Sequence, residues 1–302
     1  MTTTETSVSN QGTETAWRNA RANSAAALVG ALLAAGLVVA VLSAPGPGPL
    51  TTTCTFTTVG TTMTLDGDCT TDTTIAIPNG YTLDGNGHTI TAVDPSGGHF
   101  KGGIVENAGS VAHVTDLGVA TSGLGNVCDS GDDRLRGILF DGASGSITDS
   151  IVTDINQGAS GCQEGNGIEV RNFPLTPNTV YVTIADNVIT GYQKTGIVAN
   201  GEVSVAVTGN MVVGAGPVPY IAQNGIQLGF GASGEVRGND ISGNYYGGCS
   251  NQEAAQTGCT PWVSGGLLLY DVDANSVQHS MNQYRGNQRN VLLVTSASLG
   301  NP

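Results

Sequence analysis

The sequence predicts an all-β solenoid, and three observations carry this prediction. Charged residues make up only 11% of the chain, whereas 45 glycines and many Thr, Val and Ile favour strands and turns over helices. A Gly followed by an aliphatic residue recurs along the chain. About fourteen residues after most of these pairs comes a short alternation of aliphatic and polar residues. The glycines follow no three-residue period, which excludes a collagen-like helix.

The N-terminal part has a different composition. Residues 1–24 are rich in Thr, Ser, Asn and Glu without apolar periodicity, so we expect a disordered tail. Residues 25–44 are apolar and uncharged and could form one membrane-spanning helix. Because Arg18 and Arg21 precede this stretch, the rest of the chain should lie outside the membrane. A cleaved signal peptide and an uncleaved transmembrane anchor both fit. Residues 45–53 form a stiff Pro/Gly linker.

Residues 54–302 carry the repeat. Its Gly-aliphatic pairs begin at Gly103, Gly137, Gly167, Gly196, Gly225 and Gly266. Alternation with period two predicts short strands with one buried face, and a repeat of several short strands is typical of a solenoid. Stacking coils ~4.8 Å apart buries their apolar stripes in one core. The length corresponds to about eight to ten coils, preceded by one apolar N-terminal helix.

An asparagine recurs within the second pattern. Asn187, Asn210 and Asn239 occupy the same position in three consecutive coils. Stacked asparagines at a turn can hydrogen-bond along the solenoid axis and relieve left-handed backbone strain. We therefore expect a structural ladder rather than a catalytic set.

The run from Ile75 to Ile90, I-A-I-P-N-G-Y-T-L-D-G-N-G-H-T-I, resembles the first coils of pectin-lyase-like proteins. In that superfamily an apolar strand, a Pro/Asn-Gly turn and an L-D-G-x-G-x-x-I strand open a right-handed parallel β-helix. The resemblance covers about residues 54–295 and implies this fold in an exported bacterial β-helix repeat protein. Since the fold hosts lyases, hydrolases, epimerases and adhesins, it does not by itself assign an activity.

Six cysteines in an exported chain predict disulfides, and six thiols allow fifteen connectivities. The fold that the resemblance implies narrows these. It would place two cysteines in the N-terminal cap, two in corresponding loops of adjacent coils and two around an insertion, which gives Cys54 with Cys69, Cys128 with Cys162 and Cys249 with Cys259. No CxxC pair or histidine cluster supports a metal site instead.

Enzymes of this fold work on a groove along one parallel sheet, so the outward positions beside the Gly-aliphatic turns form the candidate site. Four of the chain's ten Lys and Arg fall there. Three outward rows are expected: Arg136, Asn166, Thr195 and Asn224; Leu139, Glu169, Val198, Gln227 and Leu268; Asp141, Arg171, Asn200 and Gly229.

Candidate catalytic residues, acting as base, acid or carboxylate-holding cation, are Arg136, Glu169, Arg171 and Lys194. Candidate substrate-binding residues are Asp132, Asp133, Arg134, Glu164, Asn166, Tyr192, Asn224 and Gln227. Tyr220 and Phe230 are further stacking platforms. The alternative is a solvated face in which an Asp141–Arg171 rung contributes little.

Other site signatures are absent. The chain has no R-x-K motif of polygalacturonase-like hydrolases, and its Asp132-Asp133 pair lies in a Cys-bounded loop. If the chain is a pectate-lyase-like enzyme, its acids would bind Ca²⁺ as the cofactor. The four histidines (His88, His99, His113 and His279) are scattered, and none is expected to pair with a Ser or Cys nucleophile.

Composition and pattern together predict an extracytoplasmic protein, secreted or anchored through residues 25–44, that binds and could cleave or modify polysaccharide on one sheet face. The alternative is a non-catalytic display or adhesion solenoid. A net charge of −14 and a pI near 4.3, without a basic patch, exclude nucleic acid as a partner.

Overall fold

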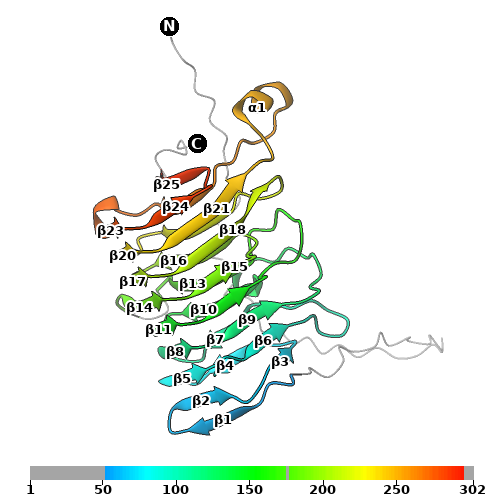
Figure 1. Ribbon diagram of the computed structural model, residues 1–302, viewed down its shortest axis with the longest axis vertical. Coiled ribbons are helices and arrows are strands. Elements are labelled where there is room, and N and C mark those ends of the chain that lie inside the picture. Colours follow the sequence, from blue (N-terminus) through cyan, green and yellow to red (C-terminus); the bar gives the residue numbers. More distant parts are fainter. Residues whose placement is uncertain (1–51, 175–176, 296–302) are drawn as a thin grey trace, which may run out of the picture.

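The computed structural model describes residues 52–174 and 177–295, which form three β-sheets (Figure 1). Strands of the three sheets alternate along the chain, so that each coil contributes one strand to each sheet. This all-β arrangement is consistent with the predicted parallel β-helix. The tail at 1–24 and the apolar helix expected at 25–44 lie outside the described residues. No helix among the described residues has the length and apolar character to cross a membrane.

The three sheets run the length of the molecule. Sheet A contains β1 (Phe56–Val59), β2 (Thr62–Leu65), β5 (Tyr81–Asp84), β8 (Val111–Thr115), β11 (Ser144–Thr148), β14 (Val180–Ala185), β17 (Val203–Thr208), β20 (Ser233–Arg237) and β23 (Val277–Ser280). Sheet B contains β3 (Cys69–Thr71), β6 (Thr89–Ala92), β9 (Gly118–Thr121), β12 (Ile151–Thr153), β15 (Val188–Thr190), β18 (Met211–Val218), β21 (Asp240–Tyr246) and β24 (Gln283–Arg285). Sheet C contains β4 (Ile75–Ile77), β7 (Gly103–Asn107), β10 (Arg136–Asp141), β13 (Asn166–Asn172), β16 (Thr195–Gly201), β19 (Asn224–Gly229), β22 (Gly265–Tyr270) and β25 (Arg289–Val294).

The core lies between the sheets and is built from inward-facing rows of aliphatic side chains. In sheet C one such row is fully buried and runs through Ile138, Ile168, Ile197, Ile226 and Leu267. Each strand supplies one side chain to a row, and adjacent coils bring these side chains into contact. The Gly-aliphatic pattern therefore marks core positions, as expected for a solenoid that buries one stripe per coil.

The asparagine ladder forms at the corner between sheets A and B. The backbone N–H of Asn187 donates to Oδ1 of Asn210 (3.0 Å), and that of Asn210 donates to Oδ1 of Asn239 (2.9 Å). Asn282 extends the ladder by one coil, because its Oδ1 accepts the N–H of Asn239 (3.0 Å). The left-handed residue at this corner is not the asparagine itself but the one before it, for example Asp186 at φ 57°. The ladder thus satisfies backbone donors beside the strained residue.

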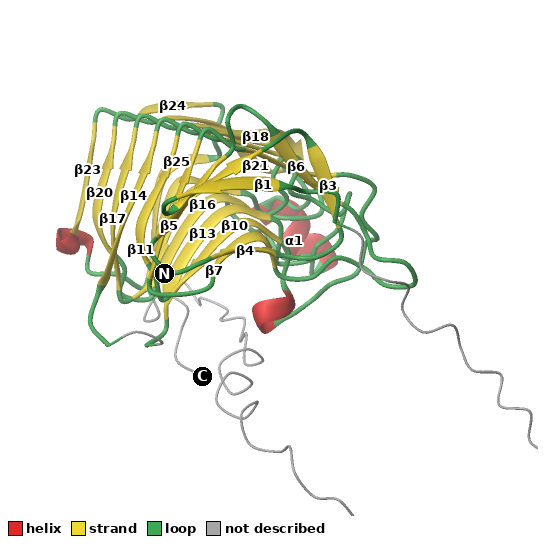
Figure 2. Cartoon of the chain, turned by 90° about the horizontal axis from the view of Figure 1, so that it is seen from below, coloured by secondary structure: helices red, strands yellow, loops and turns green. Residues whose placement is uncertain are grey.

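Long connections from sheet B to sheet C lie together on one side of the molecule (Figure 2). They include a 3₁₀-helix at Gly131–Asp133 and helix α1 at Asn251–Thr257, and a second 3₁₀-helix, Ala274–Ser276, lies elsewhere, between β22 and β23. Three disulfides close the described chain: Cys54–Cys69 at the N-terminal end, Cys128–Cys162 between two of these loops, and Cys249–Cys259 around α1. These are the pairs that the implied fold predicts.

Candidate functional site

The outer face of sheet C has the expected row register in its central coils. Arg136 pairs with Asn166, Leu139 with Glu169, and Asp141 with Arg171. The coil that contains β7 differs from the prediction, because Val105, not Ile104, aligns with Ile138. A slip of one residue exchanges the inward and outward faces of a strand. Ile104 and Val105 are both buried aliphatics, so the Gly-aliphatic marker could not separate the two registers.

The central part of this face is not the open groove that the sequence suggested. The outward residues Leu139, Glu169 and Val198 are 1%, 5% and 2% exposed. The loop before β10 is bound to this face through Arg136, which pairs with Glu169 and donates to three loop carbonyls. The loop before β10 is fixed by the Cys128–Cys162 disulfide and by Glu164, whose two carboxylate oxygens accept the backbone N–H groups of Asp129 and Leu135 (2.9 and 2.8 Å). Glu164 therefore holds a loop and does not face a ligand.

Arg136 and Glu169 form a buried ion pair, with Nε 2.8 Å from Oε2. Arg136 also donates three hydrogen bonds to backbone carbonyls of the covering loop at Gly131, Asp132 and Arg134. Burial by itself would raise the pKa of Glu169, but the charges of Arg136 and Arg171 outweigh it and lower that pKa. Arg136 thus fixes a loop to the sheet and does not serve as an acceptor for a substrate proton.

Arg171 lies one row further along and pairs with the acids Asp132 and Asp141. Its Nη2 donates to Asp132 (2.8 Å) and to Asp141 (2.7 Å), and its Nη1 is 3.9 Å from Glu169. The Asp132 side chain is 85% exposed, whereas that of Arg171 is 7% exposed. Burial opposes the charge of Arg171, but these acids raise its pKa above the ordinary value. Arg171 therefore stays a cation and cannot serve as a base.

Lys194 lies apart from the Arg136–Glu169 pair. Its Nζ donates to the carbonyl of Ala222 (2.9 Å), and burial together with the nearby Arg134 charge lowers its pKa to about 8. A pKa near working pH suits a general base. The pKa of the partly buried Arg134 guanidinium is also lowered, mainly by burial.

The remaining predicted binding residues are mostly engaged within the protein. Asp133 pairs with Lys101 at the surface (2.9 Å). Asn166 donates to Glu169 (2.8 Å), Asn224 accepts the N–H of Gly265 (2.9 Å), and Gln227 donates to Asn200 (3.3 Å). Of these residues, Asp133 presents its side chain to solvent.

Tyr192 is not a stacking platform. It is 1% exposed and belongs to the hydrophobic core, where its hydroxyl donates to Oδ1 of Asn244 (2.6 Å). Gly196 on the next strand lies close to its ring, since a Cβ there would be 3.1 Å from Cε1. Because Gly196 has no side chain, the Tyr192 ring fits into the interior. The sequence analysis placed Tyr192 on the surface because it did not take this space into account.

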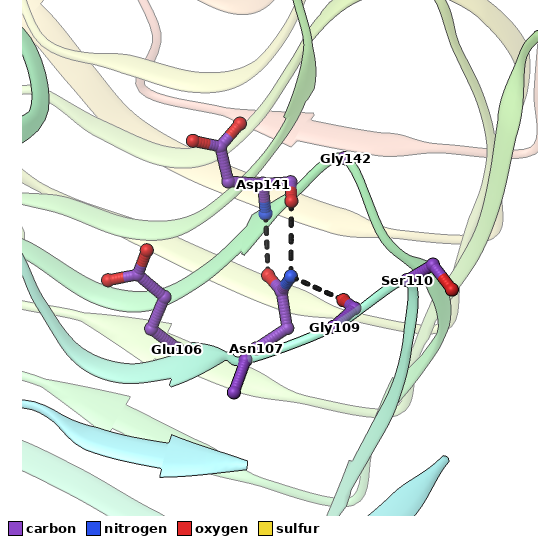
Figure 3. Close-up of a pocket in the computed structure, with 7 residues that line it drawn as sticks. Glu106, Asn107, Gly109, Ser110, Asp141 and Gly142 are labelled. Atoms are coloured by element: carbon purple, nitrogen blue, oxygen red, sulfur yellow. Dashed lines mark hydrogen bonds between the residues drawn. The ribbon is translucent and has the colours of Figure 1, made fainter. Parts of the chain in front are cut away.

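The register shift brings a residue that the sequence analysis missed into the outer row. Glu106 aligns with Leu139 and lines a cavity of about 310 Å³ together with Asn107, Asp141 and the following turns (Figure 3). Asn107 joins the two coils, because its side chain accepts the N–H of Asp141 (2.7 Å) and donates to its carbonyl (3.1 Å). Burial and the charge of Asp141 raise the pKa of Glu106. Oδ1 of Asp141 is buried without a hydrogen-bond partner among the described residues.

Three aromatic side chains continue this edge of sheet C toward the C-terminal coils. The ring centroids of Phe173 and Phe230 are 5.9 Å apart, and those of Phe230 and Tyr270 are 5.1 Å apart. Phe173 and Phe230 are 48% and 45% exposed. Gly201 leaves room for Phe173 to reach across its coil, because a Cβ there would meet the Phe173 ring at 3.3 Å. Phe230 adopts φ 55°, a strained value for a bulky residue.

These groups form one surface, which we call the corner strip: Glu106, Asp141, Phe173, Phe230 and Tyr270. Tyr270 lies in the same outer row as Asp141 and Arg171. From Glu106 on β7 to Tyr270 on β22 the strip crosses six adjacent strands, so it is on the order of 25 Å long at the strand spacing of a sheet. It offers acids at one end and aromatic rings at the other.

Two further groupings bear on chemistry. Among the described residues, the cluster of potential metal ligands is Cys128, Cys162 and Glu164, but the two sulfurs form a disulfide and both Glu164 oxygens accept backbone N–H groups. Contrary to the expectation for the histidines, Nδ1 of His113 lies 2.9 Å from Oγ of Ser146. This pair joins β8 and β11 on the outer face of sheet A, where parallel register places the two residues side by side.

Comparisons with models of known protein families and with curated proteins find no match to this chain.

Proposed function

We propose that this chain is an exported, right-handed, pectin-lyase-like β-helix that binds polysaccharide along the corner strip. The observation that carries the proposal is the contiguous row formed by Phe173, Phe230 and Tyr270 on one edge of sheet C. Exposed aromatic faces are suited to stacking on the apolar faces of sugar rings. The three disulfides are compatible with an extracellular location.

Binding is better supported than cleavage. Arg136 and Glu169, two of the predicted catalytic residues, are buried and paired with each other, and Arg171 is a permanent cation. If the strip also hydrolyses its ligand, we infer that Glu106 is the proton donor, since its pKa is raised, and that Asp141 beside Arg171 is the ionised partner. The acids also disfavour polyuronates, which would place like charges together without a bridging cation.

The non-catalytic display solenoid stays the second candidate. One observation favours it: Arg136 and Glu164 hold the loop before β10 in place through buried hydrogen bonds. A rigid rod would need such contacts, whereas an enzyme groove would need free side chains.

The test uses the full chain in mild detergent and a panel of neutral, amino-bearing and acidic polysaccharides, with and without Ca²⁺. Affinity electrophoresis measures binding, while reducing-end and ultraviolet assays detect cleavage by hydrolysis and elimination. Loss of one ring should weaken binding about 3- to 10-fold, because an aromatic contact contributes ~0.5–1.5 kcal/mol. We expect this for Phe230→Ala and Tyr270→Ala.

Tyr181→Ala provides the matched control, since Tyr181 is 67% exposed on sheet A, away from the strip. Equal losses from Tyr181→Ala and Phe230→Ala would contradict the corner strip as the binding surface. Absence of binding to every polymer would favour the display solenoid. Product formation that Glu106→Gln abolishes would establish cleavage at the strip.

A further inference from the structure

The two ends of the solenoid are closed differently. At the N-terminal end β1 pairs antiparallel with β2, and the N–H of Thr53 donates to Thr70 of β3 (2.9 Å). The Cys54–Cys69 disulfide fixes this segment across the first coil. This reversed strand covers the edge of β2, and β1 itself becomes the edge strand of sheet A at this end.

At the C-terminal end, no strand in the described part of the chain follows β23, β24 and β25 in their sheets. The inward-facing Val291 and Leu293 are 38% and 52% exposed, whereas Leu267 and Leu269, their partners one coil earlier, are 0% and 3% exposed. The asparagine ladder also stops here, because the described chain supplies no further coil to accept the N–H of Asn282. Among the described residues, nothing therefore covers the core and the strand edges beyond β23, β24 and β25, which lie together at this end (Figure 1).

The ends also differ in charge. Residues 52–100 contain no Lys or Arg, and Asp66 and Asp68 lie between the first strands. Residues 274–302 contain no Asp or Glu, and Arg285 and Arg289 lie in the last coil. Arg285 pairs with Asp240 of the preceding coil, whereas the Arg289 side chain is exposed and donates to the carbonyl of Gln288 (3.3 Å).

We propose that the open C-terminal end binds the N-terminal end of a second copy of this chain, head to tail. The free edge of β1 would then lie antiparallel to β23, and the exposed Val59 of β1 would bring apolar surface to the interface. Opposite charges steer and orient such an encounter. Two C-terminal ends facing each other would instead bring their arginines together. Because the contact joins different surfaces, it can repeat and form short chains of copies.

The test measures the mass of the full chain in mild detergent by light scattering and sedimentation between about 1 and 100 μM. We expect a concentration-dependent series of species that weakens as NaCl is raised, since exposed charges are screened. Arg289→Glu at one end and Asp66→Lys at the other should each weaken association at least 10-fold. Glu202→Lys changes the charge equally at an exposed turn between β16 and β17 and should leave association unchanged.

Mixing the two end variants gives the decisive result. Arg289→Glu and Asp66→Lys together restore opposite charges at one contact, and the other contact between the two variants is the native one, so the mixture should recover association into alternating chains that neither variant forms alone. Circular dichroism of each variant confirms that the sheets are intact. A wild-type chain that stays monomeric at 100 μM would overturn the proposal. So would association that Arg289→Glu disrupts and Asp66→Lys leaves intact, because that pattern indicates contact between two C-terminal ends.

Discussion

Replacing Arg136 by Met tests whether the buried charges of sheet C are structural. Met fills much of the same volume but removes the cation and all its hydrogen bonds. In the native chain Arg136 is 2% exposed, lies 2.8 Å from Glu169 and donates to three loop carbonyls. The substitution therefore leaves a buried carboxylate and releases the loop before β10.

The expected cost follows from these contacts. Removing one partner of a buried ion pair typically costs ~3–5 kcal/mol, because the other charge stays buried. Glu169 would keep a hydrogen bond from Asn166 and the Arg171 charge 3.9 Å away, so we expect about 3 kcal/mol. The double variant Arg136→Met/Glu169→Leu removes the stranded carboxylate and should recover more than half of this loss.

Urea unfolding, followed by circular dichroism at pH 7 and pH 5, provides the assay. In the native chain the pKa of Glu169 is lowered, so its contribution to stability is present above the ordinary glutamate pKa and is lost as the pH falls through the folded value. Without Arg136, burial should dominate and raise that pKa, so the variant's deficit should shrink from pH 7 to pH 5. The control is Arg237→Met, since Arg237 is half exposed and 3.9 Å from Glu235. A loss below about 1 kcal/mol for Arg136→Met, or a deficit equal at both pH values, would refute the reasoning.

Three further predictions concern the corner, the lysine and the loop disulfide. Asn210→Ala should cost ~2–4 kcal/mol in urea unfolding because it strands two buried donors, whereas Asn282→Ala, at the half-buried end of the ladder, should cost less. Burial lowers the pKa of Lys194 from 10.5 to about 8, so native stability should rise between about pH 8 and pH 10.5 as the folded state loses its proton first; thermal melts of Lys194→Met should lack this rise. The Cys128→Ser/Cys162→Ser variant should keep its far-ultraviolet spectrum, while limited proteolysis cuts its loops faster than those of the native chain; unchanged cleavage would mean that other contacts hold the loops.

Much of the fold could be predicted because stacked coils repeat the same physical requirement. Every coil must place aliphatic residues inward at the same position, so the pairs beginning at Gly137, Gly167, Gly196 and Gly225 reveal the register. The register of β7 was mispredicted because Ile104 and Val105 are both apolar, so the local sequence fits either register equally well. Pairing with the neighbouring strands β4 and β10 distinguishes them, and the contact with β10 spans more than thirty residues of sequence.

The site was harder to predict for a different reason. Row positions follow from strand periodicity, but whether a row meets solvent depends on the loops that cross it. The loops between sheets B and C have no periodicity, and their paths are set by contacts such as those of Glu164 and the Cys128–Cys162 disulfide. The residues predicted to line a groove are therefore buried, and some of them bind the loop before β10. A polar row in a sequence identifies where a sheet carries charge, but it does not distinguish a ligand site from an anchor for loops.

The same distinction supports our proposal that the corner strip is the binding surface. A loop anchor needs its buried polar atoms satisfied, and each side-chain nitrogen of Arg136 and each carboxylate oxygen of Glu164 has a hydrogen-bond partner. A ligand surface must instead leave groups exposed or unpaired, as Phe173, Phe230 and Oδ1 of Asp141 are among the described residues. Exposed aromatic rings and an unpaired carboxylate oxygen each forgo stability that an inward or paired position would provide. Their concentration on one edge of sheet C is what a selected binding function would maintain, whereas a purely structural rod would gain nothing from it.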